Sequence, residues 1–280
     1  MGQSSHGHRM LTVNPGPFSL SVEVLLLLVA LLVAATVGGV AGRGRKTGIG
    51  NTLSDMLIAA LLAARIAFVA LWFDAYRGAP WSMLDIRDGG FNPWAGLAAA
   101  VLVGLWQGWR HAALRRPLAL GLASGALVWS GMFGAILLMS NTSLPRSPLT
   151  TLAGEPAELA KLAAGKPIVV NLWATWCPPC RRELPVLAAA QKNETWAYFV
   201  FADQGEDAST VQRYLASAGL DLDNVLLDRG ARMGPEVGSG GLPTTLFNGA
   251  DGRLVDTHMG QLTSGSLASK LSRLRARPQG

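Results

Sequence analysis

Two cysteines, the only ones in the chain, lie within the motif Trp176-Cys177-Pro178-Pro179-Cys180. The motif follows an apolar run at 168–173 and precedes a helix-like stretch at 181–191. A helix N-terminus carries unpaired N–H groups and the positive end of the helix dipole, so it favours a thiolate over a thiol. Because the thiolate is the species that attacks a disulfide, a strand that delivers a Cys-x-x-Cys pair to a first helical turn predicts thiol–disulfide exchange.

Other uses of a cysteine pair fit this chain less well. A structural zinc site needs four ligands, and the sequence offers neither a second Cys pair nor a nearby His. Covalent haem attachment requires His directly after the second Cys, where this chain has Arg181. A purely structural disulfide that closes a very short loop is the alternative left open. We therefore predict no metal and no other cofactor.

Apolar residues are unevenly distributed along the chain. Hydrophobic residues make up 50% of the sequence and charged residues only 15%, a composition typical of membrane proteins. Four long apolar stretches precede the Cys motif, and the third is short for a bilayer. The predicted membrane spans are Phe18–Val40, Leu53–Phe73, Trp94–Trp109 and Leu118–Met139.

The formal net charge of +6 is concentrated between these apolar stretches. Basic residues gather at Arg43–Lys46 and at Arg110–Arg116, whereas the loop Asp74–Pro93 is less basic. Because basic loops stay in the cytoplasm, this order predicts a multi-pass protein of the bacterial inner membrane with both termini outside. The Cys pair would then lie in the periplasm, where disulfides persist. No basic stripe with interleaved aromatic residues occurs, so we predict no nucleic-acid partner.

The apolar half also has a resemblance of its own. The segments Ala64–Phe68 and Asp85–Phe91 resemble the early spans of prolipoprotein diacylglyceryl transferases, in which an Arg-containing span precedes acidic-Gly-Gly and His-Gly-Gly stretches. The stretch Asn92–Gly96 has no His, and the family's later signature span is missing. The resemblance therefore implies a truncated relative that contacts membrane lipids without transferase activity. Arg65 lies deep in its apolar stretch and needs a partner, for which Asp88 is a candidate.

A polar, proline-containing linker at 141–148 leads to a region where strand-like and helix-like segments alternate, which predicts an α/β domain. The expected helices are Pro156–Ala164, Pro178–Gln191, Ala208–Ala218 and Ser264–Arg275. The expected strands are Ile168–Leu172, Trp196–Ala202, Val225–Leu227, Thr244–Phe247 and Leu254–Thr257. The chain would thus comprise a tail at 1–17, a four-span domain at 18–140, the linker, and an α/β domain at 149–280.

The segment Val169–Pro185, which contains both cysteines, resembles the TlpA/ResA/DsbE group of membrane-anchored thioredoxin-like proteins. The segment Gly241–Thr245, followed by Asp251–Arg253, carries the same resemblance, which extends over residues 149–275. One departure is Asn248-Gly249, where the group usually has an acidic residue before its turn. The implied fold class is an α-helical four-span membrane domain plus an α/β thioredoxin-like domain.

Position and resemblance together assign roles. Cys177, at the helix start, is expected to be the exposed nucleophile, and Cys180, one turn in, the buried resolving thiol. Pro243 resembles the cis-proline of the family, which would leave the backbone of Leu242 free to bind a partner strand. We expect substrate contacts from Trp176, Pro178, Leu242 and Thr244.

Glu183 matches an acid that the TlpA/ResA-like group carries near its active site. Residues three positions apart share one helix face, so Glu183 is expected to reach Cys180 and move its proton. Asn171 stands where ordinary thioredoxins carry a buried acid, and it cannot titrate. The alternative for Glu183 is a carboxylate favoured only by the helix dipole.

The resemblance implies a membrane-anchored thiol–disulfide oxidoreductase that reduces disulfide-bearing periplasmic proteins, with apocytochrome c among the possible targets. Its electrons would come from a transmembrane donor of the DsbD type. Two alternatives stay open: an oxidant or isomerase in the same compartment, and a lipid-binding membrane protein with a regulatory redox domain. The Pro178-Pro179 dipeptide does not decide between reductant and oxidant.

Overall fold

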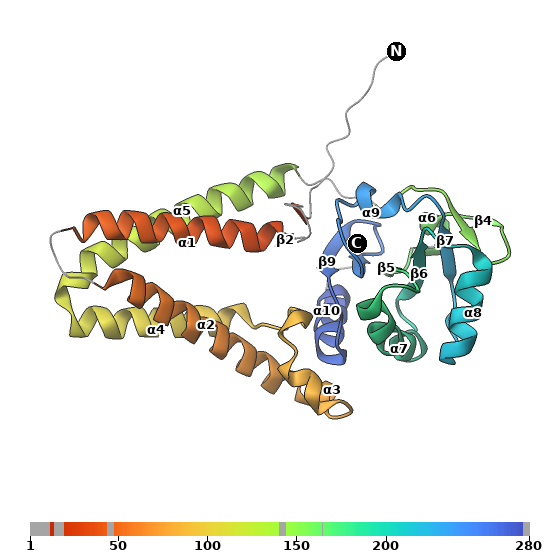
Figure 1. Ribbon diagram of the computed structural model, residues 1–280, viewed down its shortest axis with the longest axis horizontal. Helices are drawn as coiled ribbons and strands as arrows, with labels where there is room; N and C mark the ends of the chain where they lie inside the picture. Colours follow the sequence, from red (N-terminus) through yellow and green to blue (C-terminus); the bar gives the residue numbers. More distant parts are fainter. Residues whose placement is uncertain (1–11, 14–19, 44–47, 140–143, 164, 277–280) are drawn as a thin grey trace, which may run out of the picture. The chain divides into compact units, whose positions relative to one another are not determined.

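The computed structural model describes residues 12–13, 20–43, 48–139, 144–163 and 165–276 (Figure 1). The chain divides into two compact units. Among the described residues, the helical unit lies within 20–74 and 90–139, and the α/β unit within 75–89 and 144–276. The predicted membrane region 18–140 therefore contributes its middle segment, Ala75–Gly89, to the α/β unit. Of the predicted basic loop, Arg45 and Lys46 lie outside the described residues.

Four long helices form most of the helical unit. They are α1 (Val22–Ala41), α2 (Ile49–Leu71), α4 (Pro93–Arg110) and α5 (Arg115–Met139). The short elements in residues 12–114 are β1 (Thr12–Val13), β2 (Leu20–Ser21), α3 (Phe73–Tyr76) and the 3-10 turns η1 (Pro80–Leu84), η2 (Ile86–Asp88) and η3 (Ala112–Leu114).

Small residues allow α1 and α5 to pack closely. A Cβ atom at Gly121 would lie 2.6 Å from the carbonyl oxygen of Ala34, and one at Gly125 would lie 2.9 Å from that of Ala30. Only glycine permits this approach of two backbones, as at helix contacts in membranes. The pair α2 and α4 is joined by polar groups, because Thr52 Oγ1 donates to Gln107 Oε1 over 2.8 Å.

The predicted four-span domain is not confirmed. Among the described residues, two helices are long and apolar enough to cross a membrane, Ile49–Leu71 and Ala112–Ala135, and a shorter apolar helix covers Leu25–Ala41. The helix α4, which contains the third predicted span, has 18 residues, and its last turn carries the polar Gln107 and Arg110. At 1.5 Å per residue it is about 27 Å long, close to the hydrocarbon thickness of about 30 Å, so its polar end rather than its length sets it apart.

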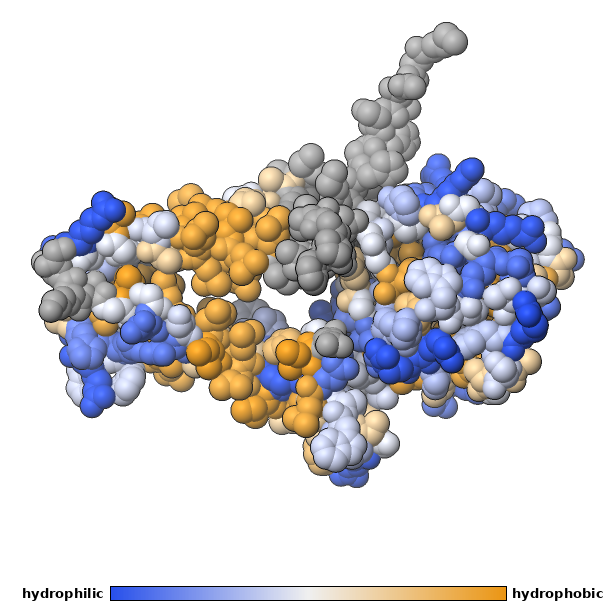
Figure 2. Space-filling view, viewed as in Figure 1, coloured by the Kyte–Doolittle hydropathy of each residue, from blue (hydrophilic) through white to orange (hydrophobic). Residues whose placement is uncertain are grey.

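The surfaces of the two units differ in polarity. Figure 2 shows hydrophobic residues gathered over the long helices, whereas the visible face of the α/β unit is mainly hydrophilic. On these helices Leu32, Ile66 and Leu102 have exposed fractions of 66%, 68% and 66%. The apolar surface of the helical unit is therefore extensive, and large exposed apolar patches mark interaction or membrane surfaces.

A seven-stranded sheet is the centre of the α/β unit, with the order β4-β3-β7-β6-β5-β8-β9. The strand β5 lies inside the sheet, where it pairs parallel with β6 and antiparallel with β8. The strands are β3 (Leu149–Thr151), β4 (Pro156–Ala157), β5 (Ile168–Trp173), β6 (Tyr198–Gln204), β7 (Val225–Asp228), β8 (Thr244–Asn248) and β9 (Leu254–Met259). The helices are α6 (Leu159–Ala163), α7 (Pro178–Asn193), α8 (Ala208–Ala218), α9 (Met233–Glu236) and α10 (Ser264–Ala276).

The side chains of β5 point alternately to the two faces of the sheet, and only those on one face contact the redox helix α7. Val169 and Trp173 belong to a core cluster that includes residues of α7, α8 and α10. Ile168, Val170 and Leu172 belong to a second cluster that includes residues of α6 and α9. Because strand side chains alternate between faces, Asn171 shares the face of Val169 and Trp173, the one covered by α7.

Most predicted elements of the α/β domain are present, with small shifts at their ends. The helix Ala208–Ala218 is confirmed at both ends. One correction concerns Pro156–Ala164: its first residues form β4, which pairs with β3, and α6 begins only at Leu159. Sequence reasoning also missed β3 and α9, which are short. Residue 164 lies outside the described ranges.

Within the α/β unit, the segment Ala75–Gly89 packs against the start of α10. Tyr76 is fully buried, and its hydroxyl donates to Asp88 Oδ2 over 2.8 Å. The Thr263 hydroxyl donates to the same carboxylate oxygen, also over 2.8 Å. A Cβ atom at Gly265 would overlap the Tyr76 ring. The segment therefore fits α10 only because residue 265 lacks a side chain.

Arg65, in the helical unit, contacts Gly90 and Phe91. Its Nη1 donates to the carbonyl oxygen of Gly90 over 2.8 Å. Its guanidinium also lies 5.8 Å from the centre of the Phe91 ring. A cation placed over an aromatic face is stabilised by the ring's electrons.

Candidate active site

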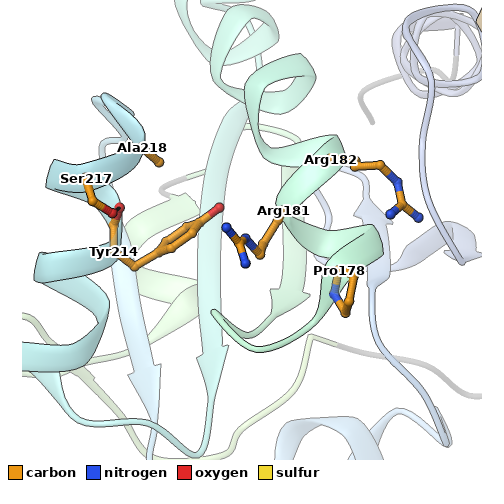
Figure 3. A pocket seen from close by; sticks show the side chains of 6 residues that line it. All are labelled: Pro178, Arg181, Arg182, Tyr214, Ser217 and Ala218. Carbon is orange, nitrogen blue, oxygen red and sulfur yellow. Dashed lines mark hydrogen bonds between the residues drawn. The ribbon is translucent and has the colours of Figure 1, made fainter.

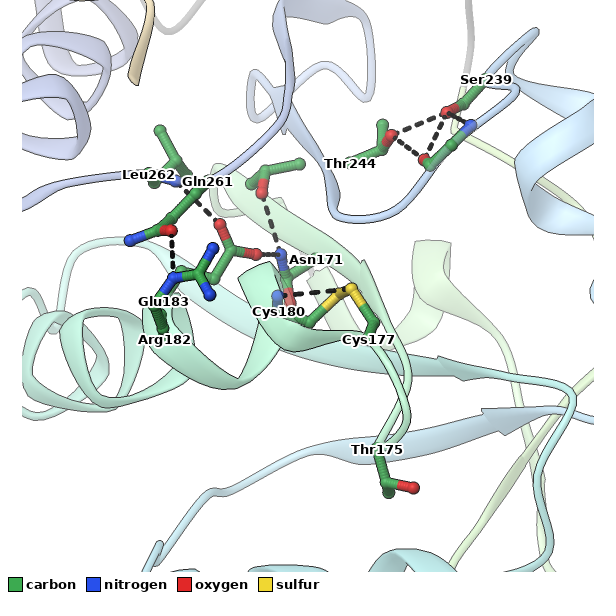
Figure 4. Close-up of a disulfide and its surroundings, with 12 residues drawn as sticks. Asn171, Thr175, Cys177, Cys180, Arg182, Glu183, Ser239, Thr244, Gln261 and Leu262 are labelled. Carbon is green, nitrogen blue, oxygen red and sulfur yellow. Dashed lines mark hydrogen bonds between the residues drawn. A yellow bond between two sulfur atoms is a disulfide. The ribbon is translucent and has the colours of Figure 1, made fainter. Parts of the chain in front are cut away.

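The two cysteines form a disulfide at the start of α7 (Figure 4). Cys177 is the N-cap residue of α7, and its sulfur accepts a hydrogen bond of 3.3 Å from the backbone N–H of Cys180. The helix N-terminus is thus directed at the Cys177 sulfur, which favours a thiolate there after reduction. The predicted exposure of Cys177 needs correction: its exposed fraction is 3%, against 0% for Cys180.

Glu183 points into the protein from the redox helix, toward Asn171 (Figure 4). Its Oε1 accepts a hydrogen bond of 2.7 Å from Asn171 Nδ2, and its Oε2 accepts one of 2.8 Å from the backbone N–H of Leu262. The Asn171 amide also donates to Thr245 Oγ1 over 2.9 Å. Glu183 has no exposed surface. Its carboxyl group is therefore held inside the domain and does not act as a solvated first-turn charge.

Burial raises the pKa of Glu183 from its usual value of 4.5 to about 7. The hydrogen bonds from Leu262 and Asn171 favour the charged form and oppose this change, but the loss of solvation outweighs them. A carboxyl group with such a pKa is partly protonated and partly ionised near neutral pH. It can therefore both accept and release a proton.

The cis peptide bond between Leu242 and Pro243 was predicted and is present. Within the described residues, the backbone N–H and C=O of Leu242 make no hydrogen bond. The expectation for Thr244 needs correction, because this side chain is buried. Its hydroxyl donates to the carbonyl oxygen of Gly241 over 2.7 Å and lies 2.6 Å from Ser239 Oγ. Thr244 therefore supports the loop from inside rather than facing a substrate.

Trp176 and Pro178 lie at the surface beside the disulfide. Within the described part of residues 149–276, Trp176 is the one exposed large apolar side chain, with an exposed fraction of 66%. A pocket of about 420 Å³ begins at Pro178 (Figure 3). It is lined by Pro178, Arg181 and Arg182 of α7 and by Tyr214, Ser217 and Ala218 of α8. The Arg181 guanidinium lies 5.4 Å from the centre of the Tyr214 ring.

Sequence reasoning missed a pair of acids next to the active-site loop. The Glu206 carboxylate accepts two hydrogen bonds of 2.6 Å from Thr175, one from the backbone N–H and one from the hydroxyl. The backbone N–H of Glu206 donates to Asp203 Oδ1 over 2.9 Å. Asp203 lies at the end of β6 and Glu206 follows that strand, which is the parallel neighbour of the redox strand β5. Parallel strands end at the same edge of a sheet, where ligands and reactive groups collect.

No group of three or more His, Cys, Asp or Glu side chains suited to a metal ion occurs in the described ranges.

Comparison with known proteins assigns the α/β unit to a family. The Redoxin family matches residues 139–273. The ResA thiol-disulfide oxidoreductase of Halalkalibacterium halodurans is 33% identical over 117 residues, which cover 41% of this chain and 65% of that protein. The thiol:disulfide interchange protein DsbE of Pseudomonas fluorescens biotype C is 30% identical over 148 residues, which cover 51% of this chain and 82% of that protein.

A solved structure of MTB dsbF, in its mixed oxidized and reduced forms, is 22% identical and covers 47% of this chain and 99% of its own, with a TM-score of 0.43. These similarities lie in the redox half, and they give the diacylglyceryl transferase resemblance no support. The buried Cys pair at a helix start, the cis-proline and the ResA and DsbE relatives agree with one another. The chain belongs to the family of thiol-disulfide oxidoreductases that includes ResA and DsbE, and the Redoxin match covers its α/β part.

Proposed function

We propose that this protein is a membrane-anchored reductase of disulfide-bearing proteins in the bacterial periplasm. The observation that carries the proposal is the Cys177–Cys180 pair at the start of α7, beside the exposed Trp176. An isolated structural disulfide needs neither an exposed aromatic neighbour nor a buried acid of near-neutral pKa. Both features suit a site that must bind another protein and move protons.

The proposed reaction begins with the reduced pair. The Cys177 thiolate attacks one sulfur of the substrate disulfide, which forms a mixed disulfide and releases one substrate thiolate. The Cys180 thiolate then attacks the Cys177 sulfur, which re-forms the internal disulfide and releases the second substrate thiolate. The substrate gains two electrons and two protons, and the cysteine pair loses them. A transmembrane dithiol donor of the DsbD type is the proposed source of the electrons that regenerate the pair.

Glu183 is the proposed proton acceptor for Cys180. As the resolving thiol loses its proton, the ionised Glu183 carboxylate becomes protonated, so charge and protons balance. The hydrogen bonds from Asn171 and from the Leu262 N–H fix the carboxyl group within the domain. Because Asn171 cannot titrate, Glu183 is the acid on this face of β5 to which we assign the transfer.

Substrate binding is proposed along the surface that surrounds Cys177. Trp176 offers an aromatic face, and Pro178 leads into the pocket between α7 and α8. The backbone of Leu242 has a donor and an acceptor available for an extended substrate segment. Addition of such a segment to exposed backbone is a recurrent mode of peptide recognition.

The helical unit is proposed to anchor the redox domain in the inner membrane, in contact with lipids. Two helices of sufficient length and apolarity support this anchoring. The basic loops Arg43–Lys46 and Arg110–Arg116 support a multi-pass arrangement with both termini in the periplasm. Tethering raises the effective concentration of the redox domain near a membrane donor. A periplasm-specific reporter fused after Gly280 is expected to be active, and a reporter active only in the cytoplasm would contradict this placement.

Trapping tests the reductase proposal directly. In Cys180→Ala the mixed disulfide cannot resolve, so Cys177 is expected to retain its substrate, and mass spectrometry identifies the partner. Cys177→Ala is the matched control and should retain nothing. The reduction potential separates the alternatives, because a value near −270 mV, about that of thioredoxin, marks a reductant and one near −120 mV, about that of DsbA, an oxidant.

A further inference from the structure

Two neighbouring parallel strands place an acid pair beside the loop that carries Cys177. In the pairing of β5 with β6, Trp173 lies opposite Asp203. Both strands therefore end at the same edge of the sheet. After β5 the chain runs through Thr175 to Cys177, and after β6 it runs through Glu206 into α8.

The loop after β5 is a tight turn, and the side chain of Glu206 is hydrogen-bonded to it. The backbone N–H of Cys177 donates to the carbonyl oxygen of Ala174 over 3.2 Å, which closes the turn around Thr175. Glu206 accepts both the N–H and the hydroxyl of Thr175, each over 2.6 Å. Hydrogen bonds to a charged acceptor are the stronger class. Glu206 therefore fixes the turn whose last residue is Cys177.

Behind Glu206, Asp203 has no exposed surface. Its Oδ1 accepts the Glu206 N–H, while its Oδ2 is buried without a hydrogen-bond donor in the described structure. A second buried negative charge beside Glu206 would be repelled by it. A proton on Asp203 removes that charge and supplies a donor toward the Glu206 carboxylate. Burial and then Glu206 raise the pKa of Asp203 to about 8, and the charge of Asp207 acts in the same direction.

We propose that Asp203 and Glu206 form a positioning pair for the nucleophile: protonated Asp203 supports the Glu206 carboxylate, which holds Thr175 and so sets the placement of Cys177. The pair does not touch the reacting sulfur. The inference rests on the proposed role of Cys177 as the attacking thiolate, and it adds a second acid site, separate from Glu183, that acts before substrate is bound.

A consequence is an upper pH limit on exchange. When Asp203 loses its proton, two negative carboxylates face each other, and the half-buried Glu206 relieves the repulsion by turning toward solvent. The hydrogen bonds to Thr175 are then lost. The exchange rate also depends on how much Cys177 is ionised, so each rate is corrected by dividing it by the fraction of Cys177 thiolate. That fraction is obtained from the pH dependence of Cys177 alkylation. The corrected rate should fall around pH 8.

The experiment uses the full-length protein in detergent, reduced and mixed with oxidised glutathione between pH 6 and pH 10. Asp203→Asn keeps a neutral donor at every pH, so its corrected rate should stay flat where the wild type declines. Glu206→Ala should lower the rate at pH 7 about tenfold, the effect of about 1.4 kcal/mol from a lost charge-assisted bond. Thr175→Val, which removes only the hydroxyl bond, should give a smaller loss. Asp221→Asn changes an exposed acid on a different part of the domain and should match the wild type.

The outcomes separate this inference from the proposed function. If the corrected exchange rate of Asp203→Asn declines with pH in the same way as that of the wild type, the positioning pair is wrong. It is also wrong if Glu206→Ala and Thr175→Val both exchange at the wild-type rate. If the variants behave as predicted with glutathione but Cys180→Ala retains no protein partner, the proposed reductase function is wrong while the positioning pair stands. If Glu206→Ala does not fold, the exchange rate of Thr175→Val and the pH profile of Asp203→Asn still test the positioning pair.

Discussion

At the scale of single residues, Glu183 links the stability of the domain to pH. Because its pKa is raised from 4.5 to about 7 in the folded state, the folded protein binds the proton more tightly than the unfolded chain. The stabilisation is fully present below pH 4.5 and is lost as pH rises through about 7. The full difference is about 3 kcal/mol. Glu183→Gln should flatten the dependence of unfolding free energy on pH between 5 and 8, measured by denaturant titration of the oxidised protein.

The same substitution tests the proton transfer. If Glu183 accepts the proton of Cys180, Glu183→Gln should slow release of the mixed disulfide and remove the part of its pH dependence that is centred near 7. Asp256→Asn, at a partly exposed acid paired with Lys270, is a control for the loss of a carboxylate elsewhere in the domain. An unchanged pH profile of release would leave Glu183 with a structural role only.

At the scale of elements, local patterns predicted the chain from β5 to α8 well. The apolar run of β5, the Cys-x-x-Cys pair at the start of α7 and the helix-like stretch of α8 are each a signal contained within one short segment. The partners of Glu183 and Thr175 were not predictable in this way. The Leu262 N–H is 79 positions from Glu183, and Glu206 is 31 positions from Thr175. Such contacts depend on the sheet order, which local patterns do not determine.

The end of α8 offers a clean test of one such local signal. Gly219 has a φ of 62° and ends α8, and a Cβ atom there would meet nothing within 4 Å. The cost of a side chain is therefore purely conformational. Gly219→Ala should lower the free energy of unfolding by about 1 kcal/mol. Gly219→Asn should cost less, because asparagine tolerates left-handed backbone. Equal losses for both variants, measured by thermal unfolding, would contradict this account of the helix end.

At the scale of the whole molecule, the division of the chain departs from its apolar pattern. The segment Ala75–Gly89 comes between two long apolar helices, yet it belongs to the α/β unit. Nothing local to the segment predicts this, because its partners Thr263 and Gly265 lie far along the chain. The segment contacts Thr263, which directly follows Leu262 in the chain, and the Leu262 N–H donates a hydrogen bond to Glu183. The segment therefore touches the stretch of chain that holds the buried acid of the redox site.

The close approach of Tyr76 to α10 makes this packing testable. In Gly265→Ala the new methyl group would overlap the Tyr76 ring. The ring must therefore move, which breaks the hydrogen bond from its hydroxyl to Asp88. Hydrogen exchange of residues 75–89 should become faster in the full-length protein. In a Tyr76→Ala background the ring is absent, so Gly265→Ala should add little further change. Residues in contact show such non-additive effects, whereas distant ones add. If the two substitutions accelerate exchange independently, the segment does not pack on α10 in the folded protein.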